Sequence, residues 1–161
     1  MATTVVTPDQ NTIVSEIEIG APPARVFQAL TDAGELQRWF NDASCPIKTW
    51  EMDARLGGRY RYTTEKGTVI VNNVSAFECH GEIVEFDPPR VLAYTWIANW
   101  HDDAEGPTQV ATHVRWELTP KAGGTHLKVT HSGLATLPIA RKDYTGGWTG
   151  VVAMLKAFVE K

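Results

Sequence analysis

The C-terminal stretch from Asp143 to Glu160 most strongly limits how this chain can fold. Its large apolar residues recur at steps of four, three, four and three, the spacing of one helix face: Tyr144, Trp148, Val151, Leu155 and Phe158. The same stretch contains Gly146, Gly147 and Gly150. Each glycine disfavours a helix interior by about 1 kcal/mol relative to alanine. Either the first two glycines precede the helix, or the missing side chains allow a close crossing over a sheet or leave room for a guest beside Trp148.

The rest of the chain supplies the sheet that such a helix would cover. Residues 13–19 alternate as a half-exposed strand, and residues 21–31 and 34–40 form two short helices with apolar faces that include Trp39 and Phe40. Residues 41–58 are rich in turn formers and are interpreted mostly as loop. From residue 59 onward, five or six strands follow, separated by turn signals. The order predicts the α+β class, with a curved antiparallel sheet around the C-terminal helix and two short helices after the first strand.

Length and charge narrow the organisation and the partners. With 161 residues and 43% hydrophobic content, the chain fits a single domain over residues 1–161, with residues 1–12 as a loosely ordered start. The net charge of -4 argues against a nucleic-acid partner. The sequence contains no apolar run long enough for a membrane span and no signal peptide, so we expect no membrane association and a cytoplasmic location. Cys45 and Cys79 are expected to be reduced thiols.

Motifs for metal, cofactor or nucleophilic chemistry are not recognisable in the sequence. The candidate metal ligands do not converge: His80, His101, His113, His126, His131 and Cys79. His113 lies on the polar face of its predicted strand and His131 on the apolar face of its own. We therefore expect no metal, no cofactor and no assigned catalytic residue.

Two polar residues stand out against apolar strand faces. His131 follows Leu127 and Val129 on an inward face, and Glu85 shares a face with Ile83 unless a bulge at Gly81 shifts the register. A buried polar group needs a partner, so each either forms hydrogen bonds inside the core or lines a solvated cavity. As an alternative to a structural role, His131 could anchor a ligand or act as a general acid or base.

Five blocks of the sequence, in this order, resemble a known family. They are "APPARVFQALTDAGELQRWF", "LGGRY", "GEIVEFDPPRVLAYTW", "GGTHLKVTHSGL" and "GGW". Together they look like the C-terminal-type domain of activators of the ninety-kilodalton heat-shock protein ATPase, in the START-like (SRPBCC), birch-pollen-allergen-like superfamily, over about residues 13–160. The resemblance implies the helix-grip fold but no single activity, because the superfamily includes lipid and hormone binders, cyclases and aromatases. The activators themselves carry an additional N-terminal domain, for which residues 1–12 leave no room.

The sequence therefore favours a binding protein for a small apolar or aromatic molecule held between the sheet and the C-terminal helix. The expected ligand-binding residues are Tyr60, Tyr62, Leu92, Tyr94, Trp96, Trp116, His131, Trp148 and Leu155. A cofactor-independent cyclase, aromatase or hydrolase that uses His131 or Glu85 is an alternative. Whether the protein is an enzyme therefore stays open at this point. An accessory protein of chaperones in the stress response is a second alternative. A homodimer formed through an edge strand also stays open.

Overall fold

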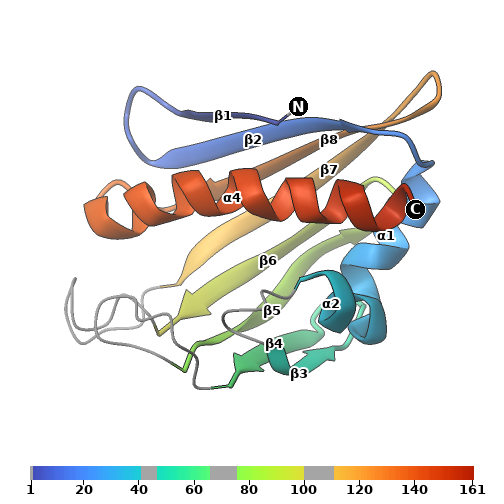
Figure 1. Ribbon diagram of the computed structural model, residues 1–161. Helices are drawn as coiled ribbons and strands as arrows, with labels where there is room; N and C mark the ends of the chain where they lie inside the picture. Colours follow the sequence, from blue (N-terminus) through green and yellow to red (C-terminus); the bar gives the residue numbers. More distant parts are fainter. Residues whose placement is uncertain (1, 41–46, 66–75, 100–110) are drawn as a thin grey trace.

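The computed structural model describes residues 2–40, 47–65, 76–99 and 111–161, and it confirms the α+β helix-grip architecture (Figure 1). One antiparallel sheet has the strand order β1-β2-β8-β7-β6-β5-β4-β3. The strands are β1 (Thr3–Val6), β2 (Thr12–Ile19), β3 (Ile47–Met52), β4 (Arg59–Thr64), β5 (Glu78–Asp87), β6 (Val91–Ala98), β7 (Thr112–Lys121) and β8 (Gly124–Ser132). The helices within the described ranges are α1 (Pro23–Thr31), α2 (Ala33–Trp39) and α4 (Pro138–Val159).

Helices α1 and α2 follow β2 directly, as the sequence predicts. Proline is tolerated in a first turn, and α1 begins at Pro23. The Asp32 side chain then accepts a hydrogen bond from the backbone N–H of Glu35 and caps α2. At the end of α2, Trp39 is buried and its indole N–H donates to the Ala29 carbonyl at 2.8 Å. Trp39 therefore fixes α2 against α1, on the apolar face that the sequence predicts for it.

Helix α4 includes all three glycines, so the alternative that the helix starts after Gly147 is wrong. Its buried residues are Ala140, Trp148, Val152, Leu155 and Val159, with Tyr144, Val151, Met154 and Phe158 partly buried. Gly146, Gly147 and Gly150 are exposed, and a Cβ added to any of them meets no atom of the described chain within 4 Å. The glycines face solvent, which also contradicts a close sheet crossing and a guest at Gly150.

The backbone of α4 lies over one half of the sheet. It runs closest to β2 and β1 and to helix α1, whereas α2 packs on β3 (Figure 1). Thr149 of α4 bonds Thr4 of β1 through their hydroxyls at 2.7 Å. Over the other half, the inner face of the sheet is filled mainly by its own large side chains. This asymmetry sets where an interior site can form.

Three local expectations differ from the structure. Residues 47–52 form edge strand β3, where the sequence predicted loop. The strand was missed because Trp50 is its one residue that is fully turned into the core. Residues 3–6 form edge strand β1, paired with β2, where a loose start was expected. The bulge of β5 lies between Ile83 and Glu85 rather than at Gly81.

Candidate ligand-binding interior

The nine residues expected to bind a ligand are all buried, and most of them share one aromatic cluster. The rings of Tyr60 and Tyr94 lie 4.5 Å apart, and Trp96 lies 5.7 Å from Trp148. Trp148 also meets Trp116 edge-on at 5.5 Å. Strands β4, β6 and β7 and helix α4 thus bring their aromatic side chains together on the inner face of the sheet. Whether these residues bind a ligand stays a prediction.

His131 is fully buried and has a partner at each ring nitrogen. The Trp148 indole N–H donates to Nδ1 at 3.0 Å, and Nε2 lies 2.6 Å from the Thr112 hydroxyl. Since indole nitrogen can only donate, Nδ1 carries no proton and Nε2 donates to Thr112. The Thr112 hydroxyl in turn donates to the Trp96 carbonyl at 3.2 Å. The ring is therefore a neutral link between α4, β8 and β7, as the structural interpretation of this histidine predicts.

The tyrosine hydroxyls of the cluster are bonded inside the protein. Tyr60 donates to the Thr95 carbonyl at 2.6 Å, and Tyr94 accepts from the Trp116 indole N–H at 2.9 Å. Burial raises the pKa of Tyr60, Tyr62 and Tyr94 above the usual tyrosine range. Burial likewise raises the pKa of the Cys79 thiol, which lies 3.7 Å from the Tyr60 hydroxyl. These groups are protonated at neutral pH and serve as hydrogen-bonding groups, not as bases.

Glu85 does not belong to this interior. The bulge after Ile83 turns it outward, and its carboxylate pairs with Arg115 at 2.9 and 3.2 Å. These bonds hold the pKa of Glu85 below its ordinary value. Glu85 and His131 are therefore not brought together as an acid–base pair.

The sequence predicts that His113 and His131 lie on opposite faces of the sheet, and the structure confirms it. His113 pairs in register with Ser132, and His131 pairs with Val114, so the two imidazoles lie on opposite faces of the sheet. In the ranges that the structure describes, no group of three or more metal-binding side chains is placed to hold an ion. His101 and Cys45 lie outside those ranges. Among the described helices, none combines the length and apolarity needed to cross a membrane.

Sequence reasoning missed Trp50, which extends the cluster from edge strand β3. Its ring lies 4.9 Å from Tyr62, 6.2 Å from Tyr60 and 5.7 Å from Phe40. The signal available was a lone tryptophan within the short segment "IKTWEM". With no second buried side chain in that segment, the alternation that identifies a strand is not visible.

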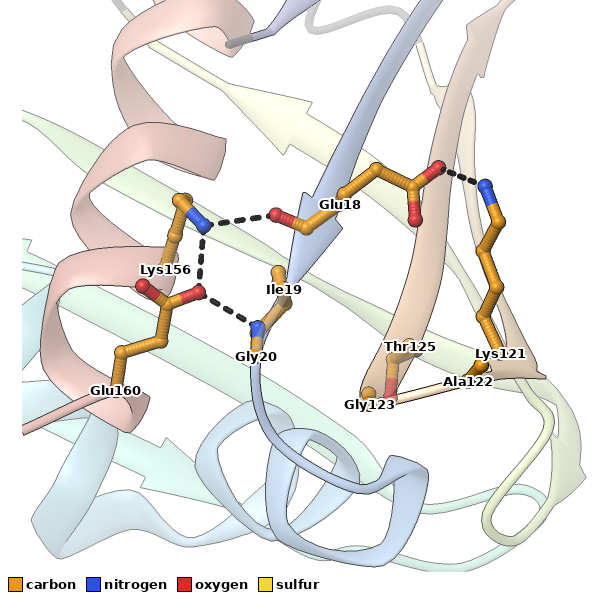
Figure 2. A pocket seen from close by; sticks show the side chains of 10 residues that line it. Glu18, Ile19, Gly20, Lys121, Ala122, Gly123, Thr125, Lys156 and Glu160 are labelled. Atoms are coloured by element: carbon orange, nitrogen blue, oxygen red, sulfur yellow. Dashed lines mark hydrogen bonds and ion pairs between the residues drawn. The ribbon is translucent and has the colours of Figure 1, made fainter.

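A second candidate is a surface pocket of about 410 Å³ where the end of α4 meets the ends of β2 and β8 (Figure 2). Its charged groups are engaged with one another. Lys156 donates to the Glu18 carbonyl at 3.0 Å and to Glu160, whose carboxylate accepts the Gly20 N–H at 2.6 Å. Lys121 bonds the Glu18 carboxylate at 2.9 Å. These contacts fasten the helix end to the sheet, so we favour the aromatic interior as the site.

Comparisons with known proteins agree with this geometry. The family model described as Activator of Hsp90 ATPase homolog 1-like protein matches residues 20–160. The chain belongs to this family. No curated protein matches it significantly.

Solved structures similar to this family member are found across bacteria. One from Chromobacterium violaceum is 27% identical with a TM-score of 0.75, covering 94% of this chain and 98% of the other. One from Mycobacterium smegmatis is 20% identical with a TM-score of 0.79, covering 98% and 96%. An AHSA1-like protein from Aeromonas hydrophila is 20% identical with a TM-score of 0.71, covering 92% of each chain. These likenesses support the fold.

Proposed function

We propose that this family member is a cytoplasmic binding protein for a small, largely apolar or aromatic molecule, held among the aromatic side chains of β4, β6 and α4. The observation that carries the proposal is the asymmetry of helix coverage. Helix α4 runs along β2 and β1, while the space over β4 to β6 is filled by Tyr60, Tyr62, Tyr94 and Trp96. Side chains can change rotamer to admit a guest, whereas a backbone layer would have to move as a unit.

The chemistry of this interior favours binding over turnover. Apolar walls with a few polar groups are typical of small-molecule sites. The interior tyrosines and Cys79 are protonated, and the imidazole of His131 is engaged at both nitrogens. General acid–base catalysis at neutral pH requires a group poised to exchange its proton near that pH. The cyclase-like alternative therefore has less support than binding.

The accessory-chaperone alternative requires an exposed surface for a protein partner. The exposed large apolar side chains of the described chain are spread over four segments: Val5 and Val6 in β1, Leu56 in the turn before β4, Val84 in β5 and Ile139 in α4. They do not follow one strand or helix face. This arrangement favours ligand binding in the interior over a protein partner on the surface.

The test uses N-phenyl-1-naphthylamine, a neutral apolar fluorophore, with heteronuclear NMR on the folded protein. We expect saturable binding, with the largest amide shifts in β4 to β6 and around Trp148. Tyr62→Ala should raise the dissociation constant about tenfold, because the ligand loses its contact with one aromatic ring. Leu118→Ala, an equally buried truncation on β7, is the matched control and should leave the dissociation constant within about twofold of the wild-type value. Binding that is absent, or shifts confined to the surface, would overturn the proposal.

A further inference from the structure

The indole N–H of Trp50 is a buried hydrogen-bond donor without a partner in the described chain. The residue is 9% exposed, and Nε1 is shielded from solvent with no acceptor in reach among the described residues. Buried donors are nearly always paired, because leaving one unpaired costs about 1–3 kcal/mol. The other indole donors in the described part of the chain, those of Trp39, Trp116, Trp96 and Trp148, have acceptors at Ala29, Tyr94, Tyr144 and His131. Trp50 therefore departs from the pattern of its own interior.

The surroundings of Trp50 do not supply the missing acceptor. The rings in contact with it are Phe40, Tyr60 and Tyr62, and neither tyrosine oxygen is placed to accept a hydrogen bond from Nε1. Aromatic faces accept N–H bonds only weakly compared with a carbonyl oxygen. Packing therefore holds this donor in an aromatic surrounding with its bonding capacity unused.

The unused donor specifies the chemistry of a guest. Indole nitrogen donates and does not accept, so its partner must present an acceptor atom. None of the three rings around Trp50 is charged, and burying an isolated anion in such surroundings is far more costly than burying a neutral acceptor. A carbonyl, such as that of a ketone, ester or amide, satisfies the donor without that cost. A planar body attached to it would lie against the neighbouring rings.

We infer that Trp50 is a specificity-determining residue of the interior site, and that its Nε1–H donates a hydrogen bond to a neutral carbonyl on an aromatic ligand. This inference rests on the proposed function and narrows it to one ligand class. Trp50 lies at the β3 side of the cluster, so the carbonyl end of the ligand would point toward the sheet edge. The apolar body would extend toward Tyr62 and Trp96, whose rings lie 6.2 Å apart.

The experiment compares three matched probes: 2-acetylnaphthalene, 2-isopropylnaphthalene and 2-naphthoate. The ketone should bind about 3- to 10-fold more tightly than the hydrocarbon, which corresponds to the usual net contribution of one hydrogen bond to affinity. The carboxylate should bind more weakly than the ketone. The indole proton resonance of Trp50, assigned by its loss in Trp50→Phe, should move downfield with the ketone and stay in place with the hydrocarbon.

Trp50→Phe should abolish the ketone preference while retaining binding of the hydrocarbon. Trp39→Phe, which removes a donor already paired with the Ala29 carbonyl and lies outside the expected binding residues, is the control and should keep the preference. If the hydrocarbon and the ketone bind equally to wild type, or a resident water contacts the Trp50 proton and the ketone does not displace it, this inference is overturned and the proposed function stands. If none of the three probes binds, the proposed function fails with it.

Discussion

The Trp148 indole N–H donates a hydrogen bond to Nδ1 of His131 across 3.0 Å, and both side chains are buried. This contact joins the middle of α4 to β8. It also determines which nitrogen of the imidazole carries the proton. His131 is therefore held in one tautomer by the helix that covers it.

Trp148→Phe should lower the free energy of unfolding by about 1–3 kcal/mol, because the Nδ1 acceptor of His131 loses its partner in the core. Urea denaturation measures the change. In a His131→Leu background the same substitution should cost about 1 kcal/mol less, since the hydrogen bond is already gone. Strict additivity of the two substitutions would show that this bond contributes nothing to stability.

Gly150→Ala should raise the free energy of unfolding by about 0.4–1 kcal/mol, through the reduced freedom of the unfolded chain. The site is helical and a Cβ there meets open space. Gly81→Ala is the opposite case, because its Cβ would lie 1.9 Å from the Thr95 carbonyl oxygen, so that variant should be destabilised. Thermal denaturation compares the two, and a destabilised Gly150→Ala would show that this face of α4 is covered.

Trp39→Ala should lower the free energy of unfolding by about 3–5 kcal/mol, as large aromatic truncations in cores do. Trp39→Phe retains most of the packing but leaves the Ala29 carbonyl without its donor, so it should cost about 1–3 kcal/mol. Trp50→Phe removes a donor that has no partner and should therefore cost less than Trp39→Phe. The reverse order of the two phenylalanine variants in chemical denaturation would contradict the unpaired state of Trp50.

His126 should make stability depend on pH through its two carboxylate partners. Nδ1 lies 2.6 Å from Glu18 and Nε2 lies 2.9 Å from Glu16, and these bonds raise the pKa of His126 above its ordinary value. The stabilisation is fully present below the unfolded pKa of about 6.5, and it is lost as pH rises through the raised folded pKa. The difference in unfolding free energy between wild type and His126→Gln should thus be larger at about pH 5.5 than at about pH 9.

The control for this pH dependence is the pair of substitutions Glu16→Gln and Glu18→Gln made together. In that background His126→Gln should have nearly the same effect at both pH values, because the charged partners are gone. A pH-dependent effect that persists without the two carboxylates would assign the titration to another group.

The sequence was sufficient for the elements with strong periodicity. The strand at β7, the proline-initiated α1 and the long C-terminal helix all bury several side chains at regular spacing. Edge strands β1 and β3 were missed because a strand that buries at most one side chain shows no alternation. The outward turn of Glu85 depends on a bulge that only the pairing with β6 reveals.

The interior was predicted in composition but not in its bonding. Spacing places Trp96, Trp148 and His131 on inward faces, and the structure brings them together. The spacing in the sequence cannot show that Trp148 donates to His131, or that Trp50 reaches the same cluster from a segment interpreted as loop. The orientation of the glycines was also not readable, because the apolar stripe of α4 is wide enough to fit more than one helix phase.

The position of α4 over β1 and β2 has a consequence for how the interior of such a chain can change. The contacts that anchor the helix, at Thr4, Gly20 and His131, do not involve Tyr60, Tyr62 or Tyr94. We expect substitution of Tyr60 or Tyr62 to reshape the interior while these contacts of the helix are kept. A protein built in this way can acquire a differently shaped interior through single amino-acid replacements, with no rearrangement of its backbone.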